Sequence, residues 1–201
     1  MSVSHSICPG CRLRMPVSQH SAAKNYFNCS DECWQLFGDI QAYQYGNALS
    51  FRQSHQLAVD AYACQHAGGG HPDKSVAIHL SGLFMAFELR CESIAIPALL
   101  QRFASFHADW PTLRVPSKCG SLSAFDVALV DDPIGHSEIV HTWAKEIWSA
   151  WKAEHSTISG FLHAAGIFEH VGKTEGLRAE SPSLEQFAAM SATATQQRRT
   201  E

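Results

Sequence analysis

The stretch that decides the fold lies near the middle of the chain and runs His55-Gln56-Leu57-Ala58-Val59-Asp60-Ala61-Tyr62-Ala63-Cys64-Gln65-His66. We expect a helix over residues 52–67, stopped by the run Gly68-Gly69-Gly70. Helical periodicity puts four residues of this stretch on one face, namely His55, Val59, Tyr62 and His66. This face mixes apolar and polar groups, whereas a plain core stripe is apolar. The stretch therefore becomes a candidate functional centre as well as a packing element.

Working outward from this stretch, apolar residues at helical spacing predict helices over residues 31–47, 73–90, 97–107, 132–156 and 157–170. Ser30 precedes the first of them as an N-cap, and Asp132-Pro133 opens the fifth with a cap followed by proline. Residues 108–131 contain prolines and glycines and predict a long loop, with a short strand over residues 128–130. The predicted fold class is mainly α, a helical bundle with a small N-terminal module.

Composition limits the classes of protein to which the chain can belong. Its 201 residues are 45% hydrophobic, which excludes wholesale disorder, and the net charge of -4 provides no basic field for nucleic acid. We find no long apolar run and no secretory signal, so we expect a cytoplasmic protein with no membrane segment. Seven cysteines, an odd number, favour metal ligands or free thiols over a disulfide framework.

Four of the cysteines have the spacing of a zinc site. Cys8-Pro9-Gly10-Cys11 places two thiols in a tight turn, and Cys29 and Cys33 are four residues apart at a predicted helix N-terminus. Four thiolates at this spacing suit a closed, tetrahedral, structural Zn²⁺. The order of knuckle, hairpin and helix resembles a treble-clef zinc finger.

These patterns divide the chain into three parts. Residues 1–35 form the four-cysteine module, whose last ligands begin a helix, and residues 36–171 form the bundle. Residues 172–201 are rich in Ser, Thr, Ala, Gln and Glu and predict a disordered tail. The first part is too short to bury a core, so a metal would have to supply its folding energy.

The histidines suggest a second site. If the helices pack as a bundle, His66, His79 and His155 come from three helices and converge on its interior. Three inward histidines match a divalent metal site with one open position. Asp60, Tyr62 and Gln65 would then support the ligands through hydrogen bonds. The alternative is that all of them are polar core residues with ordinary hydrogen-bond partners.

With these motifs in hand, the chain resembles an uncharacterised family of small bacterial proteins. The resemblance rests on Cys8-Pro9-Gly10-Cys11, on Val59 to His66, on His79-Leu80-Ser81-Gly82-Leu83 and on Trp143 to Trp151, and it spans residues 8 to about 165. It implies the domain limits and includes residues 60–66 in the site, but it implies no reaction. The bundle with inward histidines is also similar, by analogy, to DinB-like metalloproteins, from which this chain departs in its N-terminal module.

Two functions follow from the sequence. The first is a zinc-binding protein with a second metal or small-molecule site at the histidines, acting as a metal-dependent enzyme or a metal binder. The second is a non-catalytic adaptor that uses the zinc module to bind a partner protein. The sequence contains no phosphate loop, dinucleotide fingerprint or nucleophile–base pair, so it leaves open whether the protein is an enzyme.

Overall fold

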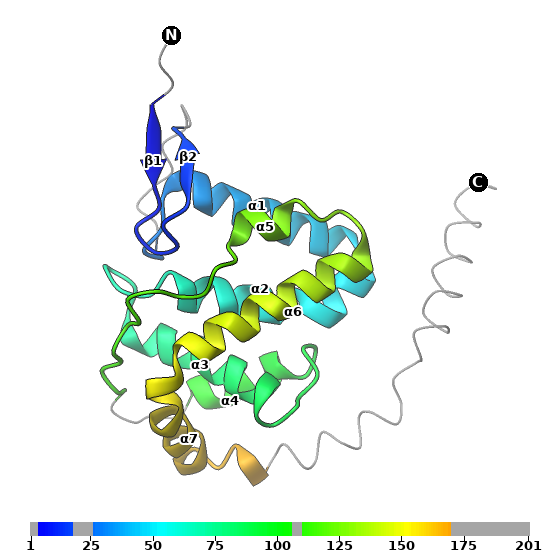
Figure 1. The fold of residues 1–201 in the computed structure, drawn as a ribbon. Helices are drawn as coiled ribbons and strands as arrows, with labels where there is room; N and C mark the ends of the chain where they lie inside the picture. The colour runs from blue at the N-terminus through cyan, green and yellow to red at the C-terminus, as the bar shows by residue number, and fades with distance from the viewer. Residues whose placement is uncertain (1–3, 18–25, 106–109, 170–201) are drawn as a thin grey trace, which may run out of the picture. The chain divides into compact units, whose positions relative to one another are not determined.

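The computed structural model describes residues 4–17, 26–105 and 110–169. Residues Met1–Ile167 form one compact unit, which the following paragraphs describe. In chain order the elements are β1 (His5–Ile7), β2 (Arg14–Pro16), α1 (Asp31–Gly46), α2 (Ala48–Gln65), α3 (Asp73–Phe87), α4 (Ile96–Ala104), α5 (Ala124–Ala128), α6 (Pro133–Ala150), a 3-10 turn (Lys152–Glu154) and α7 (His155–Ala164). The mainly helical fold class is thereby confirmed (Figure 1).

The two strands form a short antiparallel hairpin ahead of the helices. Ser6 on β1 pairs with Met15 on β2 at its centre. The hairpin is tied to the start of α1 because the Ser6 hydroxyl donates to Glu32 Oε2 at 2.6 Å. Cys8 to Cys11 lie in the loop of this hairpin, which places them beside the first turn of α1.

Side-chain caps define the ends of the first two helices. Ser30 Oγ accepts from the backbone N–H of Cys33 and begins α1. Asn47 separates α1 from α2, and its side chain accepts from the N–H of Ser50. The helix therefore begins at Ala48, four residues before the predicted start at residue 52.

Helix α2 packs against α1, α3 and α6, as Figure 1 shows. Two fully buried tryptophans of the C-terminal half form hydrogen bonds with the last turn of α2. Trp143 Nε1 donates to Gln65 Oε1 at 3.2 Å, and Trp151 Nε1 donates to the Cys64 carbonyl at 3.3 Å. Burial of such large rings contributes most to the free energy of folding, and the polar ring atoms still find partners.

A buried polar network joins α2 to α1 and α6. Gln44 is fully buried on α1 and lies within hydrogen-bond distance of Ser54, His55 and His136. His136 also bonds through Nδ1 to the Val130 carbonyl at 3.2 Å. Because each polar group is satisfied, the network stabilises the packing of the three helices and needs no ligand.

Two sequence predictions about the C-terminal half are wrong. Residues 132–156 do not form one helix, because α6 ends at Ala150 and a 3-10 turn separates it from α7, which begins at His155. No strand forms over residues 128–130, because α5 occupies Ala124–Ala128 behind a Ser123–Asp126 capping box. The predicted boundary at residue 35 falls inside α1, and the predicted tail at residues 172–201 lies outside the described residues.

The part of the chain that the structure describes contains no helix with both the length and the apolar character needed to cross a bilayer.

The core around α2 and α3 predicts a large difference between two leucine-to-alanine variants. Leu80 is fully buried on α3, so Leu80→Ala should lower the free energy of unfolding by about 2–5 kcal/mol through the cavity that it leaves. Leu129 is 68% exposed, and Leu129→Ala should change the free energy of unfolding by less than about 0.5 kcal/mol. Urea titration of both variants checks this, and equal losses would contradict the assignment of the core.

Candidate metal centre

Four side chains from separate parts of the chain converge on one point. One ligand atom from each of Cys8, Cys11, Cys33 and His66 lies within 4.8 Å of the others. Cys33 Sγ is 3.7 Å from Cys11 Sγ and 3.3 Å from His66 Nε2. Cys8, Cys33 and His66 are fully buried. The set of three thiols and one imidazole is a ligand set of structural zinc sites.

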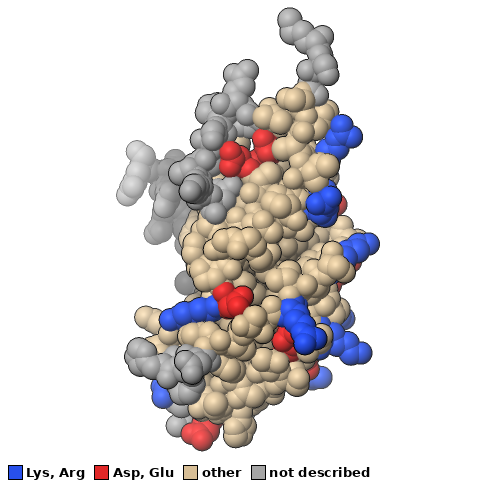
Figure 2. All heavy atoms as spheres, turned by 90° about the vertical axis from the view of Figure 1, so that its left-hand side faces the viewer, with Lys and Arg blue, Asp and Glu red and all other residues tan. Residues whose placement is uncertain are grey.

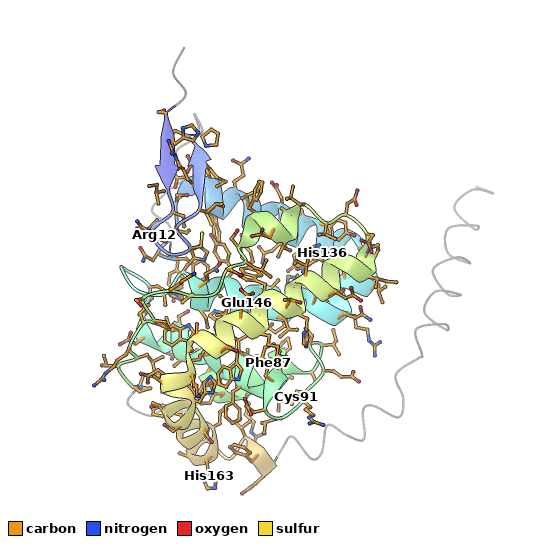
Figure 3. The ribbon with its side chains drawn as sticks, in the orientation of Figure 1. Arg12, Phe87, Cys91, His136, Glu146 and His163 are labelled. Atoms are coloured by element: carbon orange, nitrogen blue, oxygen red, sulfur yellow. The ribbon has the colours of Figure 1, made fainter. Side chains whose placement is uncertain are left out.

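The hairpin loop is folded tightly around the first two thiols. The N–H of Cys8 donates to the Leu13 carbonyl at 2.8 Å, and the N–H of Arg12 donates to the Cys8 carbonyl at 3.0 Å. Arg12, labelled in Figure 3, has a φ of 65°, in the left-handed region that closes the turn. These bonds hold Cys8 and Cys11 on the same side of the loop.

Gly10 lets this loop approach the end of α2. A Cβ on Gly10 would lie 2.5 Å from Cδ2 of the His66 ring and 2.7 Å from the Asn28 carbonyl oxygen. Any side chain at this position would therefore push the loop away from the imidazole. The N–H of Asn28 also donates to the His66 carbonyl at 3.0 Å, which fixes the segment before α1 against the same helix end.

The first turn of α1 supplies the third thiol. Cys33 lies at the positive end of the helix dipole, which favours a thiolate. The hydroxyl of Tyr62 approaches the same sulfur at 3.7 Å. The sulfur of Cys33 is thus surrounded by a helix N-terminus, a phenol and two other potential ligands.

The orientation of His66 is set by its own helix. Its Nδ1 donates to the Tyr62 carbonyl at 2.8 Å, which leaves the Nε2 lone pair directed at the thiols. Its ring stacks on Tyr62, with centroids 4.0 Å apart, and Tyr62 stacks on Phe37 on its other face, also at 4.0 Å. The imidazole is thereby held in the tautomer that a metal requires.

The thiols compete for negative charge. Hydrogen bonds from Cys11 and Cys33, which outweigh the opposing effect of burial, lower the pKa of Cys8. The pKa of Cys33 is raised, first because Cys33 donates a hydrogen bond to Cys11 and then because it donates one to Cys8, and burial adds to the effect. For Cys11 a hydrogen bond from Cys33 favours the thiolate, but Cys8 and burial outweigh it and raise the pKa to about 12. One thiolate is therefore favoured without a cation, whereas a bound divalent metal would favour all three.

Cys29, predicted as a zinc ligand, lies beside this group but is not one of its four members. Its pKa is raised to about 11, mainly by burial, and a hydrogen bond from Tyr62 opposes the shift. The structure thus brings together three of the four predicted cysteines, with His66 in the fourth place.

The other predicted histidine ligands make different contacts. His79 Nδ1 donates to Asp60 Oδ1 at 2.8 Å. His155 donates through Nε2 to the Trp148 carbonyl at 2.9 Å and stacks on the indole of that residue. Within the described residues, the group able to hold a metal includes His66 and neither His79 nor His155. The three-histidine site stays a prediction.

The three residues predicted to support that site are all buried, but they serve different contacts. Tyr62 lies between His66 and Phe37, at the thiol cluster. Gln65 Nε2 donates to the carbonyls of Cys119 and Leu122 and so anchors the loop before α5. Asp60 accepts from His79 and from Gln56.

The role of His66 at the thiols was not predicted, although its inclusion in a metal site was. It lies 33 residues after Cys33, and ligand-spacing rules pair donors within a short window. A usable signal was Gly10, because a glycine between two ligands permits another chain segment to approach the knuckle closely.

The fold and this cluster define a helical protein with a Cys3His group at the junction of a hairpin and two helices. Residues 6–152 match the family of unknown function DUF5946, and the chain belongs to that family. The expected membership of an uncharacterised family is thus confirmed. No curated protein and no solved structure matches the chain.

Gly10→Ala should weaken metal binding at the cluster because the new Cβ meets both the His66 ring and the Asn28 carbonyl. We expect metal affinity to fall about 10–100-fold, as for changes of other residues that hold a metal ligand in position. Competition with a chromogenic zinc chelator measures the change.

Gly38→Ala is the matched control, because a Cβ there meets nothing within 4 Å. Gly38 lies within α1, so alanine should raise the free energy of unfolding by up to about 1 kcal/mol and leave metal affinity unchanged. Equal metal affinities in the two variants would contradict the role given to Gly10.

Proposed function

We propose that the protein binds one Zn²⁺ through Cys8, Cys11, Cys33 and His66, and that the metal is structural. The observation that carries this proposal is the convergence of four donor atoms within 4.8 Å from the hairpin loop, α1 and the end of α2. The metal would join these elements in a treble-clef-like module. The proposal keeps three of the four predicted cysteines and replaces Cys29 by His66, a ligand on the helical body.

The donor set favours zinc among common divalent ions. Thiolates and imidazole are soft or borderline ligands, which select against Mg²⁺ and Ca²⁺. Four protein ligands leave no open position for water or substrate, so this site would act in folding and not in chemistry. The short hairpin has few apolar residues to bury, which supports a role for metal in its stability.

Elemental analysis of the purified protein tests the proposal. We expect one zinc per chain, lost in Cys33→Ser and retained in Cys91→Ser, a control thiol on the loop after α3 (Figure 3). We also expect chelation to release the hairpin first, measured as faster hydrogen exchange of the Cys8 and Arg12 amides. A zinc-free protein with protected amides would refute the proposal.

The fourth ligand can be identified by replacing zinc with Co²⁺, whose spectrum reports the number of bound thiolates. We expect a three-thiolate spectrum that is unchanged in Cys29→Ser and lost or altered in His66→Ala. A four-thiolate spectrum that changes in Cys29→Ser would show that the fourth ligand is Cys29 and not His66.

A second candidate function is that of an adaptor, in which the module binds a partner protein. It is favoured by large side chains left exposed on the module, namely Ile7 at 53%, Tyr26 at 55% and Trp34 at 38%. Figure 2 shows a face on which scattered charged side chains lie among broad uncharged areas, which suits protein contact better than phosphate contact. The double variant Ile7→Ser and Trp34→Ala should retain zinc and lose a partner captured by the wild type.

A further inference from the structure

A second polar centre lies between α2 and α3, apart from the thiol cluster. Asp60 is fully buried, and its Oδ1 accepts from His79 Nδ1 and from Gln56 Nε2, both at 2.8 Å. Its other oxygen, Oδ2, has no hydrogen-bond partner among the described residues. A buried carboxylate that is only half satisfied lowers the free energy of unfolding, and an apolar residue of similar size would avoid that cost.

The facing helix is built to admit this carboxylate. A Cβ on Gly82 would lie within hard contact of Asp60 Oδ2, so only glycine fits at that position of α3. Glycine within a helix costs about 1 kcal/mol relative to alanine. A buried carboxylate and a glycine within a helix each lower the free energy of unfolding. Together they allow the Asp60 carboxylate to lie against His79.

The carboxylate determines the tautomer of the histidine. An ionised carboxylate only accepts hydrogen bonds, so with Asp60 ionised the bond to His79 is donated by Nδ1–H. The lone pair is then on Nε2, which bonds to no described residue. The His79 side chain is 19% exposed, so part of it lies at the protein surface. Asp60 also stabilises positive charge that develops on the ring.

The same arrangement serves either metal binding or group transfer. Metal binding needs further donors, and within the described residues no set of three metal-binding side chains includes His79. Group transfer needs a nitrogen lone pair that a substrate can reach and a carboxylate that orients the ring. Near His79, on the preceding turn of α3, the Ser75 hydroxyl donates to His71 Nε2 at 2.9 Å, which gives this surface a polar rim.

We propose that Asp60 and His79 form a reactive dyad that hydrolyses activated acyl esters, with His79 as the nucleophile and Asp60 as its positioning residue. Nε2 attacks the acyl carbon, the bond to the leaving oxygen breaks, and the alkoxide departs with the electron pair and takes a proton from water. The resulting hydroxide attacks the acyl-imidazolium carbon, and the C–N electron pair returns to Nε2. The sum is ester plus water to carboxylic acid plus alcohol.

Hydrolysis of p-nitrophenyl acetate by the full-length, metal-loaded protein tests the dyad. We expect the rate to fall at least tenfold in His79→Gln and at least fivefold in Asp60→Asn. It should change less than twofold in His141→Gln, which removes an exposed histidine of α6. Circular dichroism establishes that each variant is folded. A rate that is the same in wild type and His79→Gln would overturn the proposal.

A comparison within the wild-type protein needs no variant. Diethyl pyrocarbonate acylates imidazole Nε2, and mass spectrometry of the peptides reports the rate at each histidine. At pH 7 we expect His79 to react at least tenfold faster than the more exposed His141. Equal or slower reaction at His79 would overturn the dyad, whether or not Asp60→Asn folds.

Discussion

The close approach of the hairpin loop to the end of α2 is the constraint on which the site depends. Gly10 lies against the His66 ring, and Asn28 bonds to the His66 carbonyl, so the thiols reach the imidazole only if this contact forms. The position of α2 is set in turn by buried tryptophans, whose ring nitrogens donate to Gln65 and to Cys64. Packing of the C-terminal half thus orients the His66 imidazole toward the thiols of the N-terminal module.

Charge makes this contact unfavourable unless a cation balances it. The pKa values of Cys11 and Cys33 are raised because neighbouring thiols and burial oppose further negative charge beside Cys8. A divalent metal reverses that balance, since bound thiols are deprotonated and attracted to the ion. Metal affinity and the free energy of folding would therefore be linked at this junction if the group holds a metal.

The helices were largely predictable, because apolar periodicity and caps such as Ser30 and Asp132 are local signals. The break after α6 was not, since no proline or glycine marks residues 151–156. There the chain turns where Trp151 is buried and Glu154 accepts from the N–H of Arg114, a contact between distant residues. His155 consequently starts a new helix and leaves the face that a continuous helix would give it.

The residues of the site were likewise predictable where local sequence determines their position and unpredictable where tertiary packing does. The turn of Cys8 to Cys11 and the helix start at Cys33 are local, and the spacing identified them, whereas the partner of each inward histidine depends on packing. His66 and Asp60 both lie near the C-terminal half of α2, yet one meets thiols and the other meets α3. Gly82 leaves room for the Asp60 carboxylate beside α3, and Nδ1 of His79 bonds to that carboxylate. His66 lies at the thiols, His79 bonds to Asp60 and His155 bonds to the Trp148 carbonyl, so the contacts of each histidine depend on packing that the sequence pattern does not reveal.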